Sequence, residues 1–176
     1  MWSKLKKFMA LCGSNHRNSQ NQKLLLDLKQ SLSTNHTFQI YNKIYDFPIF
    51  HSNIEYEDYP TIIKNFMNDI EQSDHIVIAT PEYIKGVPAA LKNALEWLVA
   101  SAVLYDKPVS FIVNSPHGES CFQSLLKHLK ILNPQMQEEG MLLISGKDRL
   151  RNEDGTFCSL KTQKEVAEFL AFLEKN

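Results

Sequence analysis

The sequence has few cysteines, and their placement argues against two kinds of site. Only three occur in 176 residues, Cys12, Cys121 and Cys158, and they lie far apart without a C-x-x-C pair. An odd and scattered set suits neither a disulfide framework nor a zinc site. We therefore expect free thiols in the core or on the surface.

An excess of charge of either sign is also missing. The formal net charge is -1 and the pI is about 6.6, and no basic stretch is interleaved with aromatic residues. Nucleic acid is therefore not an expected partner, because clustered Lys and Arg side chains bind such polyanions. The same balance argues against an electron carrier that docks on its partners through strong charge.

The chain contains no long apolar run. No stretch approaches the roughly 20 residues of a membrane-spanning helix, so we expect no membrane association. Basic residues precede a short apolar run at 8–12, which is too short for the core of a signal peptide and leads directly into a polar loop. We therefore expect one cytoplasmic domain, residues 1–176, which is long enough to bury its own core.

Several catalytic signatures are absent. Neither G-x-x-x-x-G-K-[ST] nor G-x-G-x-x-G occurs, which excludes a P-loop NTPase and a Rossmann dinucleotide site. Without H-E-x-x-H or clustered His and Asp residues, we expect no metal site. The segment 117–120 hints at a hydrolase, but the G-x-S-x-G elbow is missing.

What the chain does contain is a regular alternation of short apolar runs and amphipathic segments. Strands are predicted at 6–12, 37–44, 75–79, 109–114 and 141–144. Helices are predicted from Ser19 onward and at 60–72, 88–103, 122–132 and 162–174. Five strands alternating with five helices predict a three-layer α/β/α sandwich.

The segment 75–97 shows this pattern most clearly. Its β-branched apolar run at 75–79 is typical of a central parallel strand. Thr80 and Pro81 end the run, and Pro88 starts the next helix, where a missing N–H costs nothing. The loop between them therefore follows the carboxyl end of a strand, which is where open α/β sheets bind ligands.

A second candidate loop, 13–19, follows the first strand. It is rich in Gly, Ser and Asn and leads into a helix whose expected N-cap is Ser19. The N–H groups of a helix start, the hydroxyls of Ser14 and Ser19, and a cation from His16 or Arg17 can together cradle a phosphate. By itself, however, such a turn is more often a simple helix cap.

The loop at 81–88 resembles that of a known family. Pro81-Glu82-Tyr83, followed by Gly86, Pro88 and the helical sequence ALKNALEW, is similar to the second flavin loop of the NAD(P)H-dependent FMN reductases. This family includes quinone, azo-dye and chromate reductases. The resemblance covers nearly the whole chain and implies a flavodoxin-like fold, with a five-stranded parallel sheet in the order 2-1-3-4-5.

The resemblance also implies how the first loop would bind the FMN phosphate. The positions that match the family's phosphate loop are Gly13, Ser14, Ser19 and Asn21. His16 stands at the position of the family's Arg, and Arg17 comes one residue later. Either cation could contact the phosphate.

The other two loops would hold the isoalloxazine ring. In the second loop the ring contacts implied by the resemblance are Pro81, Glu82, Tyr83 and Ile84, mainly through main-chain groups, with Ile84 where the family usually carries Asn. In the third loop they are Ser115, His117 and Gly118. This loop keeps one glycine and adds Pro116, and His117 could either donate to the flavin or lie on the surface.

The implied function is that of an FMN-dependent oxidoreductase with NAD(P)H as co-substrate. Hydride would pass from the nicotinamide to FMN and on to a small-molecule acceptor: a quinone, an azo compound, a metal oxyanion or free flavin. We nominate no catalytic side chain, because the cofactor carries the electrons. Two alternatives stay open: a non-catalytic FMN-binding electron carrier or redox sensor, and a protein that has lost FMN through its changes at Ile84 and Pro116.

Two further expectations concern surfaces. On the helix at 88–103, a second apolar stripe of Ala90, Trp97, Ala100 and Leu104 would be exposed in a monomer, which predicts a homodimer or homotetramer unless a neighbouring loop covers it. The long irregular segment 45–59 is expected to border the site, because loops of this length in compact domains are usually functional.

Overall fold

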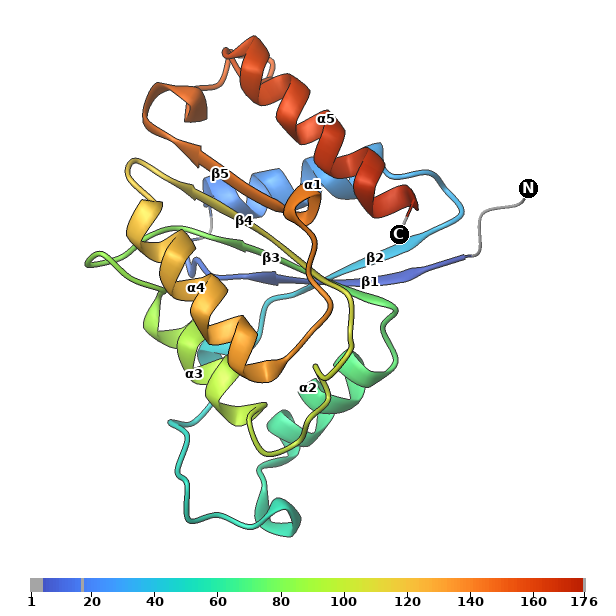
Figure 1. Ribbon diagram of the computed structural model, residues 1–176, viewed down its shortest axis with the longest axis vertical. Helices are drawn as coiled ribbons and strands as arrows, with labels where there is room; N and C mark the ends of the chain where they lie inside the picture. The colour runs from blue at the N-terminus through green and yellow to red at the C-terminus, as the bar shows by residue number, and fades with distance from the viewer. Residues whose placement is uncertain (1–4, 17, 176) are drawn as a thin grey trace.

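A computed structural model describes residues 5–16 and 18–175. Its centre is a parallel sheet of five strands in the order β2-β1-β3-β4-β5, as predicted (Figure 1). The strands are β1 (Lys7–Cys12), β2 (Thr37–Tyr41), β3 (His75–Thr80), β4 (Val109–Ser115) and β5 (Met141–Ser145). The α-helices are α1 (Gln20–Ser31), α2 (Thr61–Glu71), α3 (Ala89–Trp97), α4 (Glu119–Leu132) and α5 (Leu160–Lys175). Short 3₁₀ turns are η1 (Ile44–Asp46), η2 (Tyr56–Asp58), η3 (Glu138–Gly140) and η4 (Gly146–Arg149).

Alternation of side chains along the strands produces two helical layers. Phe8 and Ala10 of β1 pack with the apolar residues of α1 and α5, whereas Met9 and Leu11 pack with those of α2, α3 and α4. The central strand β3 is buried along its whole length, as expected for a parallel strand covered on both faces. Figure 1 shows the resulting α/β/α sandwich, which confirms the predicted fold.

Two predicted elements are too long. The second strand was expected at 37–44, but β2 ends at Tyr41, which pairs with Leu11 near the end of β1. β2 is an edge strand, so beyond β1 it has no partner for further ladder bonds.

The third helix was expected at 88–103, but α3 ends at Trp97. From Leu98 onward i to i-3 hydrogen bonds replace the α-helical ladder, and Ser101 Oγ donates to Leu98 O at 3.0 Å.

The second apolar stripe next to α3 is covered in part, so the predicted exposure is wrong for Trp97 and Leu104, whereas Ala90 is half-buried and Ala100 is exposed. Trp97 and Leu104 are buried. Trp97 Nε1 donates to Pro48 O at 2.8 Å, and the rings of Phe50 and Tyr59 meet the indole edge to face. The covering residues are therefore Pro48, Phe50 and Tyr59 of the long irregular stretch, which contact Trp97 of α3. The homodimer or homotetramer stays a prediction.

The remaining findings concern the cysteines, possible metal ligands and possible membrane-spanning helices. Cys12 and Cys121 are buried and Cys158 is exposed, and all three thiols are free. Within residues 5–16 and 18–175, no group of three or more His, Cys, Asp or Glu side chains is placed to hold a metal ion. Over the same residues, every helix is too short or too polar to cross a lipid bilayer.

Candidate functional site

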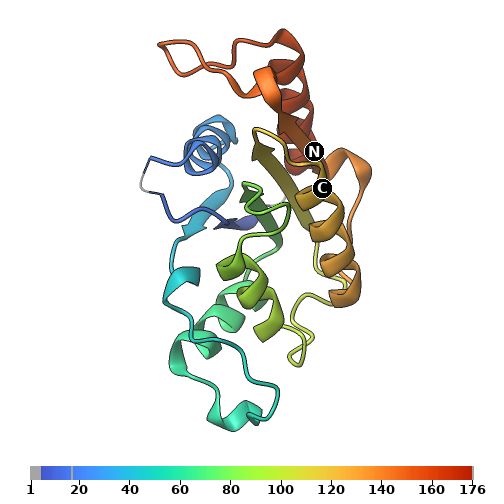
Figure 2. The same ribbon diagram turned by 90° about the vertical axis from the view of Figure 1, so that its left-hand side faces the viewer.

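The loops that follow β1, β3 and β4 lie together at the carboxyl edge of the sheet (Figure 2). Ser14 Oγ in the first loop and Tyr83 Oη in the second are 3.4 Å apart. Asn21 Nδ2, in the first turn of α1, donates to Asn114 O at the end of β4, at 3.1 Å. The structure therefore brings the three predicted loops into one place.

Gly13 allows the first loop to approach β3 very closely. Its N–H donates to Ala79 O at 2.8 Å, and a Cβ atom at this position would lie 2.2 Å from Thr80 Oγ1. Tyr45 Oη donates to Gly13 O at 2.7 Å, and burial raises the pKa of this phenol, so it stays a donor. Tyr45 was not predicted individually, because it is marked only by its place in the long irregular segment.

Two side chains of the first loop make hydrogen bonds to nearby main-chain groups. Ser19 is the N-cap of α1, as predicted, since its Oγ accepts from Asn21 N at 3.1 Å. His16 is exposed, and its Nδ1 accepts from Asn18 N at 3.2 Å. A neutral ring that accepts at Nδ1 carries its proton on Nε2, which leaves an outward donor for an anion. Arg17 lies outside the described residues.

The second loop is a tight turn that presents Ile84 to solvent. Tyr83 and Gly86 exchange both backbone hydrogen bonds, at 3.1 and 3.0 Å. The two residues between them have positive φ, 48° at Ile84 and 56° at Lys85. Such a turn favours Asn and Gly, so a fully exposed β-branched Ile at its first central position is strained.

This strain predicts the effect of restoring the residue that the family usually carries. Ile84→Asn should raise the free energy of unfolding by about 1 kcal/mol, because Asn tolerates the left-handed region. The matched control is Ile49→Asn, which alters another exposed isoleucine, one whose φ is not positive. Urea denaturation of the three proteins measures the difference. Equal midpoints for Ile84→Asn and wild type would mean that the turn stores no strain.

Glu82 connects the second loop to α4. Its side chain is 5% exposed, Oε2 accepts from Cys121 N at 2.9 Å, and Lys85 Nζ lies 3.8 Å from Oε1. Cys121 Sγ also donates to the buried Pro81, at its carbonyl oxygen, at 3.5 Å. The Glu82 carboxylate is thus occupied in holding the loop, so a contact with flavin through its main chain remains a prediction.

The third loop combines buried and exposed residues. Ser115 and Gly118 are buried, whereas Pro116 and His117 are exposed. Gly118 has a φ of 125°, and a Cβ atom there would lie 2.8 Å from Leu143 Cδ1. The one glycine that this loop keeps is therefore required by the fold. Exposure of His117 leaves both interpretations of that residue open.

Two buried amides and an arginine lie at this edge; Asn21 was among the predicted phosphate-loop residues, whereas Asn114 and Arg149 were not predicted. Asn21 and Asn114 are buried, and Asn21 Oδ1 and Asn114 Nδ2 lack a hydrogen-bond partner within the described chain. Arg149 is half-buried and its Nε donates to Asn114 Oδ1 at 3.0 Å. Asn114 could have been suspected as a site residue only because it is a polar residue at the end of an apolar strand. No sequence pattern marks Arg149 as a site residue.

These groups suit FMN. The start of α1, with Ser14 and His16, offers donors to a phosphate, and unsatisfied buried amide groups are what a polyhydroxylated ribityl chain can complete. The second and third loops follow the neighbouring strands β3 and β4, so their main-chain groups lie where a flat ring could contact them.

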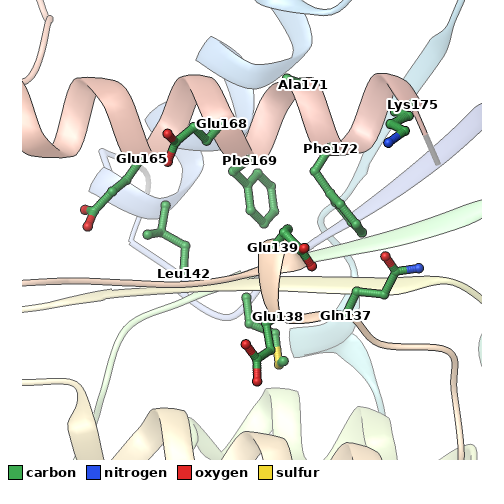
Figure 3. Close-up of a pocket in the computed structure, with 11 residues that line it drawn as sticks. Gln137, Glu138, Glu139, Leu142, Glu165, Glu168, Phe169, Ala171, Phe172 and Lys175 are labelled. Atoms are coloured by element: carbon green, nitrogen blue, oxygen red, sulfur yellow. The ribbon is translucent and has the colours of Figure 1, made fainter.

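A separate hollow of about 580 Å³ lies at the opposite edge of the sheet, between the start of β5 and α5 (Figure 3). Its floor includes Leu142, Phe169 and Phe172. Its rim carries Glu138, Glu139, Glu165, Glu168 and Lys175. Four carboxylates against one ammonium group repel a phosphate dianion, so this hollow does not suit FMN.

The chain is similar in sequence to known reductases. The chain is 34% identical over 124 residues to the NADH:(hydroxy)cinnamate reductase subunit CrdA of Vibrio ruber, a match that covers 70% of this chain and 60% of that one. It is 30% identical over 103 residues to a quinone reductase of Escherichia coli, covering 58% and 53%. The matches therefore span little more than half the length of these relatives.

The fold has a close counterpart among solved structures. FerB, a flavoenzyme NAD(P)H:(acceptor) oxidoreductase from Paracoccus denitrificans, superposes with a TM-score of 0.82, covering 97% of this chain and 96% of FerB. Its 24% identity makes this likeness one of fold. The family model for NADPH-dependent FMN reductase matches residues 6–148. The chain therefore belongs to the NADPH-dependent FMN reductase family.

Proposed function

We propose that the protein is an FMN-dependent NAD(P)H oxidoreductase that reduces a small-molecule acceptor, with quinones as the first candidates. The observation that carries the proposal is the convergence of the three loops at one sheet edge, with Ser14 and Tyr83 in contact and unsatisfied amides beside them. Family membership supports the flavin, and the names of the relatives support a quinone or a free flavin as acceptor.

In this proposal the protein's residues bind and orient. The start of α1, Ser14 and His16 hold the phosphate, and the hydrogen bond between Ser14 and Tyr83 fixes the phosphate loop relative to the ring loop. Tyr83 is about half exposed, so its ring can border the face where the nicotinamide arrives. FMN, when bound, accepts a hydride and passes on two electrons.

We also propose that the chain acts as a single cytoplasmic domain in a homodimer or homotetramer. Free thiols suit a reducing compartment. An apolar hollow between α3 and α4, with Val99 and Ile131 exposed at 57% and 74%, supports a subunit contact on a face other than the stripe at Trp97.

The test is flavin loading followed by turnover. We expect the purified protein, equilibrated with FMN and freed of excess, to keep a flavin absorption spectrum and to oxidise NADH or NADPH in the presence of benzoquinone. The same protein without FMN serves as the control. Bound FMN with NAD(P)H left untouched would favour the carrier or redox sensor, and a colourless protein would mean that flavin binding has been lost.

A further inference from the structure

Arg149 is held in place from two sides. It ends the turn η4, whose first residue, Gly146, donates its N–H to Pro116 O in the third loop at 3.0 Å. Next to Arg149, Asp148 O accepts from the fully buried Thr162 Oγ1 of α5 at 3.0 Å. The backbone that carries the guanidinium is thus fastened to both the candidate site and the helical layer above the sheet.

The Arg149 side chain is linked to the start of α1 through Asn114. Its Nε donates to Asn114 Oδ1 at 3.0 Å, and Asn114 O accepts from Asn21 Nδ2 at 3.1 Å. Asn21 is the second residue of α1. Two hydrogen bonds, one to the side chain and one to the main chain of Asn114, therefore connect the turn after β5 with the first turn of α1.

This arrangement leaves the positive charge uncompensated. No carboxylate of the described residues lies within ion-pair distance of Arg149, although its side chain is half-buried and burial lowers the pKa of the guanidinium. Nε is occupied by Asn114, which leaves the two terminal amino groups of the fork. Two buried amide atoms of the same hydrogen-bonded group, Asn114 Nδ2 and Asn21 Oδ1, have no hydrogen-bond partner among the described residues. An anion completes such a cluster, because a guanidinium binds planar or tetrahedral oxyanions through paired hydrogen bonds.

We propose that Arg149 binds the phosphate of FMN, so that the phosphate site is shared between the loop after β1 and the turn after β5. This inference rests on the proposed function. The start of α1 contributes N–H groups and a positive dipole end to the same place. In the described part of the first loop, His16 is exposed and its Nδ1 already accepts from Asn18 N. A rigid, partly desolvated guanidinium is the stronger partner for a dianion.

The experiment compares FMN with riboflavin, which has the same ring and ribityl chain but no phosphate. Dissociation constants for both flavins are measured by fluorescence titration for wild type, Arg149→Gln and Arg149→Lys. We expect Arg149→Gln to weaken FMN binding roughly 10- to 100-fold, the range for losing a charge-assisted hydrogen-bond pair. Riboflavin binding should change less than about threefold, and that binding also shows that the variant is folded. Arg149→Lys should be intermediate because it keeps the charge and loses the fork.

Lys147→Gln provides the matched control, since it removes an exposed cation from the same turn, and we expect it to leave FMN affinity unchanged. Equal losses for FMN and riboflavin in Arg149→Gln would make Arg149 a structural residue and overturn the inference alone. A raised KM for NADPH, with NADH and FMN unaffected, would assign the guanidinium to the nicotinamide 2′-phosphate and overturn it as well. A wild-type protein that binds neither flavin would overturn the proposed function together with this inference.

Discussion

Replacing Gly13 with alanine should lower the free energy of unfolding by about 3 kcal/mol, the upper part of the range for overpacking a core position. The added Cβ would lie 2.2 Å from Thr80 Oγ1 and 2.7 Å from Thr80 Cβ. Thr80 is fully buried at the end of the central strand, so it has little room to move. The first loop would have to retreat instead, and the hydrogen bond from Gly13 N to Ala79 O would be lost.

The same substitution should therefore weaken FMN binding as well as folding. Gly86→Ala is the matched control, because a Cβ there meets only ordinary contacts at 3.9 Å and φ is not positive. Urea denaturation and flavin titration are measured on both variants. If the Thr80 contact is the cause, Gly13→Ala combined with Thr80→Gly should lose less stability than the sum of the two single changes. A Gly13→Ala protein as stable as Gly86→Ala would contradict the argument.

Acidification from pH 6.5 to pH 4 should remove about 3 kcal/mol of stability through His75 alone. This side chain is 2% exposed, its Nε2 is 2.8 Å from Ser110 Oγ, and its buried Nδ1 has no partner in the described chain. Its ring lies 5.5 Å from that of Phe8. Burial, with a smaller contribution from Lys6, lowers the pKa of His75 from 6.5 to about 4.

The direction of the pH effect follows from which state binds the proton. Between pH 6.5 and 4 the unfolded chain protonates this histidine while the folded chain does not, so unfolding takes up a proton and stability falls with pH. Above pH 6.5 the contribution is complete, and below pH 4 the group causes no further loss. Chemical denaturation at several pH values measures the slope. His75→Gln should flatten it, whereas His51→Gln, at an exposed histidine, should keep the wild-type slope; an unchanged slope in His75→Gln would contradict the prediction.

Local pattern was enough to predict the layers and the loops of this fold. Apolar runs such as 75–79 can be buried on two faces only in a covered parallel sheet, and the spacing of Leu24, Leu25 and Leu28 allows one helical face inward. The ends of β2 and α3 were predicted wrongly for a shared reason. The edge strand β2 ends where its neighbour β1 ends. The helix α3 ends at Trp97, where the segment that carries Pro48 and Phe50 covers it. Both ends depend on contacts with residues distant in sequence, which the local pattern does not contain.

The candidate site was predictable only where its residues are contiguous. Ser14, Tyr83 and Gly118 lie in loops that follow strands, so their position could be inferred from the strands alone. Tyr45 and Arg149 act through contacts with Gly13 and Asn114 that span 32 and 35 positions of sequence. Such contacts depend on how separate elements pack, and no short motif records them.

The burial of two thiols near the strand ends has a consequence for an enzyme that handles quinones, as proposed. Quinones are electrophiles that alkylate thiolates, and the thiolate rather than the thiol reacts. Burial raises the pKa of Cys12, and it raises that of Cys121 to about 12, so both stay protonated at neutral pH. Burial of Cys12 and Cys121 in this flavodoxin-like fold thereby protects the enzyme from alkylation by the quinones that it would reduce.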